Sequence, residues 1–471
     1  MSQQDEYQGK PPPSVPGSSR AIVIGGGIAG LMTARVLGNH FKQVLVLERD
    51  NFPDGPNLRS GAPQGRHVHL LLLRGKQILE QLFPGLSREL IDNGARLIKM
   101  GEELGVLTYY GWRVQHAGKL SLLTFTQPLL EWCIRKRLTE IEAVEIIGGC
   151  RVNGLTADAK GVRVTGVRVR FGNTRQREHQ LCGELVVDAS GRFSRTPEWL
   201  STLGYNSPEV SVVDPFLGYT SRFYEIPSNF SMPRSKWKAL VLLGKPPDYT
   251  RGGVLLPVEG GRWHVTLVGT AKDYPPNDES GFIEFARTLR SRALYDAIKT
   301  ARPLSGVAGY RSTKNRWRHY GSYQRWPRGF IVLGDALCSL NPVYAQGMSV
   351  AALEVMVLDK WLREYEWDQD NGAGVALHVQ KELAKIIETP WLMATTDDAR
   401  WPATEGAPTG LTTQMMHHYL DAVIALATRY PKVDDLFARV VHLLEPEYML
   451  FHPRIALRAF ARLLNPLSSV R

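Results

Sequence analysis

Cysteine is scarce in this chain and long apolar runs are missing, and each absence excludes a class of protein. The 471 residues contain four cysteines, Cys133, Cys150, Cys182 and Cys338, without a C-x-x-C pair. This spacing excludes a secreted disulfide framework and a clustered zinc site, and it favours a reducing cytoplasm. No apolar run is long enough to cross a bilayer, so no membrane span is expected. Residues 1–19 lack the hydrophobic core of a signal peptide and are predicted to be a disordered leader.

Acidic residues are missing from residues 301–334, where seven basic residues occur. They are Arg302, Arg311, Lys314, Arg316, Arg318, Arg325 and Arg328. Together with a net charge of +11 for the whole chain, this segment is expected to attract anions. The simplest interpretation is that these basic side chains lie on a solvated surface. The functional interpretation is that they attract an anionic cofactor or an acidic partner protein. Nucleic acid is not expected as a partner, because no recognition helix or base-stacking motif accompanies the charge.

A glycine-rich turn lies near the N-terminus, in AIVIGGGIAGLMTARVL. The apolar run 21–24 predicts a buried parallel strand, and Gly25, Gly27 and Gly30 follow it at G-x-G-x-x-G spacing before a helix. A second strand ends at Glu48, eighteen residues after Gly30, where a carboxylate can bind the ribose of a dinucleotide. The dinucleotide contacts predicted here are Gly25, Gly27, Ala29, Gly30, Glu48 and Arg49.

A second motif, GDALCSLNPVYAQGM, occupies residues 334–348. A buried strand ends at Asp335, where an acid can hold a ribityl hydroxyl, and a long helix is predicted to begin near Gln346. Gly347 lets a ring approach the backbone, and Met348 follows it. The free amides of the helix N-terminus stabilise negative charge, as on a reduced flavin. Together the two motifs predict a flavin site.

Three further positions are candidates for cofactor contacts. Arg66 lies in a loop after the second strand, and a surface salt bridge is its alternative role. Gln127 precedes a helix that begins at Pro128. Asp188 ends an apolar strand and precedes a turn at Gly191, where open parallel sheets bind ligands, although a plain turn explains it equally well. No metal site is expected.

Over residues 218–270 the sequence pattern changes to that of successive strands, with a glycine turn at Gly260 and Gly261. This pattern predicts an inserted antiparallel sheet. Its aromatic side chains are candidates for an apolar substrate cavity, with a structural core as the alternative. These side chains are Phe223, Tyr224, Trp237 and Trp263. Beyond residue 363, apolar periodicity predicts helices that cover the flavin domain, separated by a surface loop over residues 395–413.

The motifs GGGIAG with Glu48, DASGR at residues 188–192 and GDALCSLNP with QGM resemble those of the single-component flavoprotein monooxygenases of the para-hydroxybenzoate hydroxylase fold. The strings QGRHVHLLLLRG, LFPGL, SRTPEWL and NPVYAQGMSVAA are most similar to the olefin epoxidases of polyether ionophore biosynthesis, the lasalocid group in particular. The chain departs from many relatives at Cys338, where histidine is common, and at Gln127, where arginine is common.

The resemblance implies an α/β fold with a discontinuous FAD-binding Rossmann-like domain, an inserted antiparallel β-sheet substrate domain and a C-terminal helical region. The expected boundaries are 20–103, 121–204 and 305–362 for the FAD domain, 104–120 and 205–304 for the substrate domain, and 363–471 for the helical region. FAD is the implied cofactor, with NADPH or NADH as a transient reductant and O2 as co-substrate.

The resemblance also implies a chemistry in which a flavin C(4a)-hydroperoxide epoxidises the alkenes of a long apolar polyketide in polyether antibiotic biosynthesis. The hydroperoxide carries that reaction, so no catalytic side chain is assigned. An acidic acyl carrier protein is a candidate for substrate delivery. Three alternatives stay open: an aromatic hydroxylase on the same fold, a flavin-dependent reductase and a lipid-binding escort.

Overall fold

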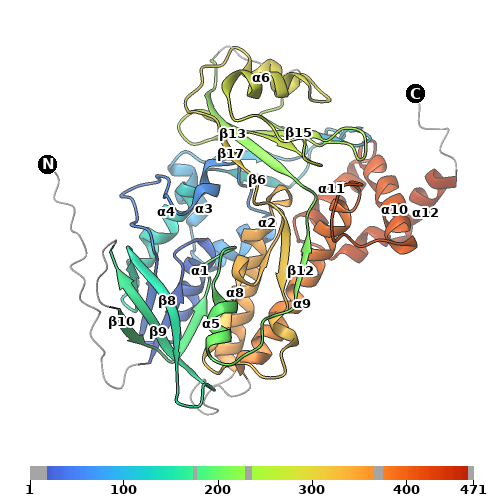
Figure 1. Cartoon of the computed structure of the whole chain (residues 1–471). Coiled ribbons are helices and arrows are strands. Elements are labelled where there is room, and N and C mark those ends of the chain that lie inside the picture. Colours follow the sequence, from blue (N-terminus) through green and yellow to red (C-terminus); the bar gives the residue numbers. More distant parts are fainter. Residues whose placement is uncertain (1–18, 173–177, 229–235, 365–374, 465–471) are drawn as a thin grey trace.

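Five parallel strands form the central sheet, in the order β19-β11-β1-β2-β7 (Figure 1). The computed structural model describes residues 19–172, 178–228, 236–364 and 375–464; apart from Ser19, the leader predicted for residues 1–19 lies outside them. The strands are buried runs rich in Val, Ile and Leu, as expected for a parallel sheet covered on both faces. They span Arg20–Ile24 (β1), Gln43–Leu47 (β2), Val144–Ile147 (β7), Leu185–Asp188 (β11) and Phe330–Val332 (β19).

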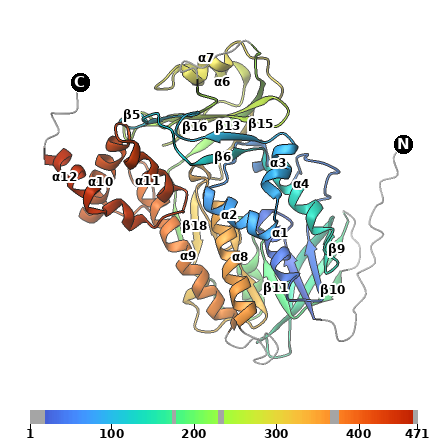
Figure 2. The same cartoon turned by 180° about the vertical axis from the view of Figure 1, so that it is seen from behind.

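Helices cover one face of this sheet and a small antiparallel sheet covers the other. α1 packs against β1 and β2, and α8 packs against α1, α2 and α9 (Figure 2). The helices are α1 (Ile28–Leu37), α2 (Leu73–Leu82), α3 (Leu86–Asp92), α4 (Gln127–Leu138) and α8 (Gly347–Glu364), with α5 (Thr196–Thr202) after β11. The antiparallel sheet comprises β8 (Cys150–Ala157), β9 (Val164–Phe171) and β10 (His179–Cys182), and it contacts β2 and β11.

A seven-stranded sheet lies above the central one, in the order β17-β13-β16-β15-β14-β4-β5 (Figure 1). Its strands are β4 (Leu104–Thr108), β5 (Gly111–Trp112), β13 (Gly218–Glu225), β14 (Ala239–Leu242), β15 (Arg251–Val258), β16 (Arg262–Gly269) and β17 (Ala308–Tyr310). Gly260 and Gly261 turn the β15–β16 hairpin with φ of 74° and 64°, which confirms the predicted glycine turn. The sheet is not wholly antiparallel, because β4 pairs in parallel with β14.

The outer face of this sheet is covered by α6 (Glu279–Arg287) and α7 (Ala293–Ile298) (Figure 2). Two smaller sheets connect the parts of the molecule: β12 (Val210–Val213) with β18 (Asn315–Arg318) and β20 (Cys338–Ser339), and β3 (Arg96–Lys99) with β6 (Ser121–Thr124). Among the described residues the α/β fold with a C-terminal helical region is therefore confirmed.

The C-terminal helices, drawn in orange and red, are α9 (Val375–Asp398), α10 (Leu411–Ala427), α11 (Pro431–Val441) and α12 (Pro453–Leu464) (Figure 1). α9 packs against α8 and belongs to the main hydrophobic core, whereas α10, α11 and α12 form a separate cluster. The prediction of a loop over residues 395–413 was wrong at both ends. α9 continues through Pro390 to Asp398 with Ile387 and Ala394 buried in the core, and α10 already begins at Leu411. None of the described helices is long and apolar enough to cross a membrane.

Candidate cofactor-binding site

The glycine turn joins β1 to α1 and leaves open space at its centre. Gly25 has φ of 103°, and a Cβ there would lie 2.6 Å from the carbonyl oxygen of Ala189. A Cβ on Gly30 would lie 1.9 Å from the carbonyl oxygen of Gly25, so this glycine is needed for packing. A Cβ on Gly27, by contrast, meets no described atom within 4 Å. Since α1 also has no side-chain cap, its free amides face space of the kind that a diphosphate fills.

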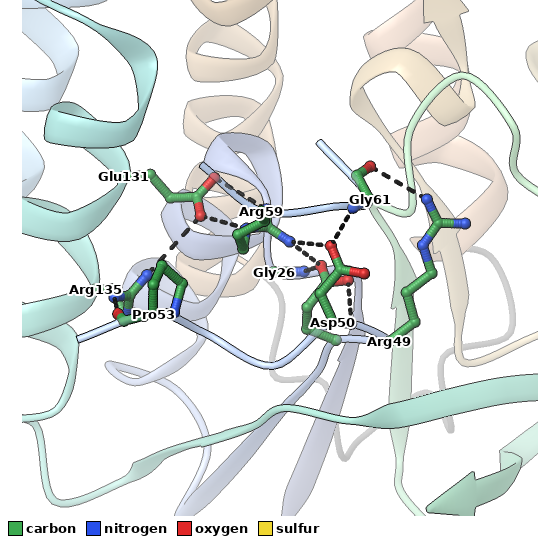
Figure 3. Close-up of polar contacts among 9 residues, drawn as sticks. Gly26, Arg49, Asp50, Pro53, Arg59, Gly61, Glu131 and Arg135 are labelled. Carbon is green, nitrogen blue, oxygen red and sulfur yellow. Dashed lines mark hydrogen bonds and ion pairs between the residues drawn. The ribbon is translucent and has the colours of Figure 1, made fainter. Parts of the chain in front are cut away.

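Glu48 follows β2 beside this turn and belongs to a charge cluster. Figure 3 shows the cluster's Asp50, Arg59 and Glu131. Glu48 Oε2 accepts a hydrogen bond from Gly26 N at 2.8 Å and lies 3.3 Å from Arg59 Nη1. Arg59 also contacts Asp50 at 3.3 Å and donates to both oxygens of Glu131, at 2.7 and 3.0 Å. Burial opposes the charge of Arg59, but the three carboxylates together raise its pKa. The acid predicted to bind the ribose is thus fixed by an arginine that had no sequence signal.

Two buried glutamines on the wall of the same cavity carry side-chain oxygens without a hydrogen-bond partner among the described residues. Gln127 begins α4 and Gln346 immediately precedes α8; their Oε1 atoms are buried without a hydrogen-bond partner in the described part of the chain. A buried amide oxygen without a partner is costly, so both atoms indicate a ligand that supplies donors. Gln346 was not predicted, although its place before Gly347 was visible in the sequence.

Asp335 lies in a short 3₁₀ helix, Gly334–Ala336, on the cavity wall. Burial raises the pKa of its carboxyl, while positive charge on Arg192, Arg316 and Arg318 acts to lower it. Ala29, Arg49, Gly347 and Met348 also line the cavity. The cavity therefore brings together the glycine turn, Glu48, Gln127 and the segment that carries Asp335 and Gly347.

Asp188 and Arg66 do not line the cavity. Asp188 is buried, and its carboxylate accepts hydrogen bonds from Ser190 N, Ser194 Oγ and Thr196 Oγ1, so it shapes the turn that presents residues 189–192. The side chain of Arg66 is exposed at the end of a 3₁₀ helix. The contact of Arg66 with the cofactor stays a prediction, whereas the arginine whose side chain is buried in this region is Arg59.

The basic segment 301–334 does not form one continuous patch. Arg318 is buried and donates to the carbonyl of Ala336 at 2.7 Å, and Arg316 donates to the carbonyl of Arg192. Arg302 pairs with Glu225, the last residue of β13, at 2.7 Å on the surface. Part of the segment's charge thus acts inside the protein, next to Asp335.

A cavity of about 1160 Å³ extends from the glycine turn to the C-terminal helices. The seven-stranded sheet contributes the inward-facing side chains of β15 and β16, such as Val254, Thr266 and Val268. The opposite wall comes from the C-terminal region and is also mainly apolar: Leu392, Met393, Met416, Leu420, Ile424, Phe437, Val440, Val441 and Leu450. The helices beyond residue 363 therefore form one wall of the cavity.

None of the four aromatic residues predicted to line the substrate cavity does so. Tyr224, Trp237 and Trp263 are buried in a second core with Phe282 and Phe285 of α6, on the other side of the sheet. Phe223 stacks on His264, with ring centroids 4.0 Å apart, near the end of β13. For Tyr224 and Trp263 the correction follows from strand geometry, since alternate side chains of a strand face opposite sides and period two alone does not say which side is the cavity. Phe223 shares a strand face with the cavity-lining Tyr219 but lies nearer the end of β13.

These features fit FAD. The open space at Gly27, the uncapped helix and the unpaired glutamine oxygens are what an extended dinucleotide with a polar ring edge requires. Gly25, Gly27 and Glu48 would hold its adenosine half, and Gln127, Asp335 and residues 346–348 would hold its flavin half. Each individual contact stays a prediction.

Comparison with known proteins agrees with this geometry. The profile of a family described as FAD binding domain matches residues 18–369. Protein Rv3254 of Mycobacterium tuberculosis is 30% identical over 449 residues, which cover 94% of this chain and 93% of that protein. Kynurenine 3-monooxygenase of Salinispora tropica is 24% identical over 356 residues, 73% of this chain and 72% of that protein. Squalene epoxidase 1 of Arabidopsis thaliana is 23% identical over 388 residues, 78% of this chain and 65% of that protein.

Among solved structures, the flavin-dependent brominase Bmp2 superimposes with a TM-score of 0.66 over 94% of this chain and all of that one. The sequence identity is 15%, so this likeness concerns the fold. It includes the C-terminal region, which the family profile does not reach.

Proposed function

Because the chain belongs to the FAD-dependent monooxygenase family that carries this FAD binding domain, we propose that it is an olefin epoxidase. The proposed reaction uses NAD(P)H and O2 to epoxidise double bonds of a long, largely apolar polyketide. The proposed setting is polyether antibiotic biosynthesis of the lasalocid kind.

The observation that carries the proposal is the apolar wall of the cavity. Apolar side chains from three parts of the chain form this wall: Met100, Leu104, Val106 and Leu122 near β4 and β6, Val254 and Val268 of the seven-stranded sheet, and Met416 and Leu420 of α10. Such a surface gains free energy by covering hydrocarbon, at about 25 cal/mol per Å² removed from water. A long apolar chain fits this surface better than a small polar substrate does.

Bound FAD, reduced by NAD(P)H, supplies the activation of O2. The protein's own part is to bind, orient and exclude water. The α1 amides and Glu48 would hold one end of the cofactor, and the loop before α8 would hold the other. The C-terminal helices supply one apolar wall of the cavity, which would limit water access and help to hold an alkene in one place. An electron-rich alkene needs no side-chain base, so no proton transfer by the protein is proposed for it.

The similarity to squalene epoxidase supports an apolar alkene as the substrate class. For delivery we propose an acidic acyl carrier protein, on the basis of the net charge of +11.

Hydroxylation of an aromatic ring is the second candidate, and one observation favours it. Tyr109, Tyr344 and Asp397 form a polar group on the cavity wall, with Tyr344 Oη 3.2 Å from Asp397 and Tyr109 Oη 3.3 Å from it. A phenol hydroxylase requires polar groups that ionise its substrate. The similarity to kynurenine 3-monooxygenase supports the same alternative.

Oxidation of a polyene and of a phenol by the purified holoenzyme separates the two candidates. We expect a long-chain polyene ester to stimulate NADPH oxidation, and the product made under ¹⁸O₂ to carry one labelled oxygen for each alkene that reacted. A phenol should leave the basal rate unchanged. Stimulation by phenols alone would establish the second candidate, and stimulation by neither would remove the epoxidase proposal.

A further inference from the structure

One buried carboxylate from the C-terminal region holds the loop between β20 and α8. Asp398, the last residue of α9, accepts hydrogen bonds from Tyr344 Oη at 2.6 Å and from Asn315 Nδ2 at 2.6 Å. Asn341 Nδ2 donates to the same carboxylate at 3.3 and 3.4 Å. Asn341 N in turn donates to Asn315 Oδ1 at 2.7 Å. Both ends of the segment 341–344 are therefore attached to one anchor.

The buried C-terminal end of α9 is an unfavourable place for the carboxylate of Asp398 unless hydrogen bonds from the loop stabilise it. Asp398 is 2% exposed, and Asn315 and Asn341 are fully buried. A negative charge at the C-terminal end of a helix opposes the helix dipole. Burial raises the pKa of the Asp398 carboxyl to about 7, while the bonds from Tyr344 and both asparagines act to lower it. Hydrogen bonds from Tyr344, Asn315 and Asn341 offset the cost of burial and of the unfavourable helix dipole. These contacts explain why an acid is present at this position.

The loop itself needs external support. Ala345 has φ of 55° and ψ of 21°, a left-handed conformation that costs a residue with a Cβ about 1 kcal/mol. The next residues are Gln346, with its unpaired oxygen, and Gly347 at the start of α8. A small movement at Tyr344 would therefore change the direction of the groups predicted to meet the flavin.

Asp398 also lies outside the residues that define the family. The FAD binding domain profile ends at residue 369, whereas Asp398 follows in the C-terminal region and lines the cavity. We propose that Asp398 is a positioning residue for the cofactor, and that the FAD site of this chain is complete only when the C-terminal helices hold the loop 341–346. This inference rests on FAD binding and is independent of the substrate class proposed above.

Asp398→Asn tests the inference, because the new amide group would place a donor against the Nδ2 donors of Asn315 or Asn341. We expect the dissociation constant for FAD, measured by titrating apoprotein and following flavin fluorescence, to rise about tenfold or more, as for the loss of one charge-assisted hydrogen bond. The visible spectrum of the bound flavin should also shift. Asp435→Asn is the matched control, since it removes a half-buried acid on α11 that pairs only with Arg439 in the described structure.

A swapped pair, Asn315→Asp with Asp398→Asn, separates positioning from general loss of stability. The exchanged side chains keep one carboxylate and one amide, so we expect FAD affinity to return to within about threefold of the wild-type value. The inference is overturned if folded Asp398→Asn binds FAD with wild-type affinity and spectrum, or if the swap is as weak as the single variant.

If Asp398→Asn does not fold, Tyr344→Phe tests the same inference, because this substitution removes only the hydroxyl group of the loop. We expect about threefold weaker FAD binding and a shifted spectrum, and unchanged values overturn the inference. These readouts use no olefin. A wild-type protein that oxidises no polyene, with variants that still lose FAD affinity, therefore rejects the epoxidase proposal and leaves this inference standing.

Discussion

Arg59 and Glu131 form a two-pronged ion pair, with Nε–Oε1 and Nη2–Oε2 distances of 2.7 and 3.0 Å, between the loop after β2 and helix α4. Their side chains are 5% and 7% exposed. The remaining nitrogen of Arg59 faces Glu48 and Asp50, each at 3.3 Å. Three carboxylates near the glycine turn thus share one buried cation.

Arg59→Gln should therefore affect both stability and cofactor binding. Removing one partner of a buried ion pair leaves unpaired charge, and we expect a loss of about 3–5 kcal/mol in the free energy of unfolding. FAD affinity should fall as well, because Glu48 loses a contact that orients it. Urea denaturation and FAD titration measure the two effects. Arg88→Gln, at an exposed pair with Asp92 on α3, is the control and should cost less than about 1 kcal/mol. Equal stability of the two variants would contradict the role assigned to Arg59.

Gly27→Ala should separate cofactor binding from folding. Gly27 has φ of −78°, which alanine adopts readily, and its Cβ would point into open space. We expect the apoprotein to keep its melting temperature while FAD binds about tenfold more weakly, because a methyl group would occupy the space predicted for the diphosphate.

Gly30→Ala is the opposite case in the same turn. Its Cβ would lie 1.9 Å from the carbonyl oxygen of Gly25, so the apoprotein itself should be destabilised. Thermal unfolding of both apoproteins makes the comparison. Wild-type FAD affinity in Gly27→Ala would show that the diphosphate lies elsewhere.

The parts of the site that sequence predicts are those built from neighbouring residues. The strand, turn and helix around Gly25–Gly30 are adjacent along the chain, and so are the strand, loop and helix of residues 330–364. Glycine spacing, an apolar run and an acid at a strand end are enough to place them. Periodicity predicted helices beyond residue 363, but the predicted loop over residues 395–413 overlaps the end of α9 and the start of α10, because tertiary packing continues α9 past Pro390.

The contacts that sequence does not predict join distant segments. Asp398 reaches Tyr344 across 54 positions, and Arg59 reaches Glu131 across 72. Neither pair has a spacing that marks it, because only the tertiary fold brings the residues together. The prediction of the residues that line the substrate cavity was wrong for a different reason. Trp263 and Thr266 lie on the same strand and face opposite sides of the sheet, and which side is the cavity depends on where α6 packs.

Trp263→Ala and Val254→Phe should have contrasting effects, because the two residues face opposite sides of the sheet. Trp263 is buried under α6, and its truncation should cost about 3–5 kcal/mol of stability without changing substrate preference. Val254 lines the cavity, so phenylalanine there should shorten the longest polyene accepted while stability changes by less than about 2 kcal/mol. Denaturation curves and a chain-length series of polyenes measure both. A change of chain-length preference in Trp263→Ala would contradict the assignment of the cavity face.

Glu354 should give the protein an unusual dependence on pH. This residue of α8 is fully buried, and its Oε2 accepts a hydrogen bond from Gly334 N at 2.6 Å. Burial raises the pKa of its carboxyl from 4.5 to about 8, against the lowering effect of the Gly334 bond and with a smaller contribution from Asp335. Between pH 4.5 and about 8 the folded state therefore holds a proton that the unfolded state has released. Stability from this group is complete below pH 4.5 and is lost as the pH rises towards 8.

Glu354→Gln removes this titration and keeps an oxygen that can accept from Gly334. Urea denaturation of both apoproteins across that pH range should show the wild type losing stability relative to the variant as pH rises, by up to about 1 kcal/mol per pH unit. The sign is distinctive, because ion-paired carboxylates stabilise a protein as pH rises and not as it falls. Parallel pH profiles for the two proteins would show that Glu354 is already ionised in the folded state, and the buried contact to Gly334 would then be that of a charged group.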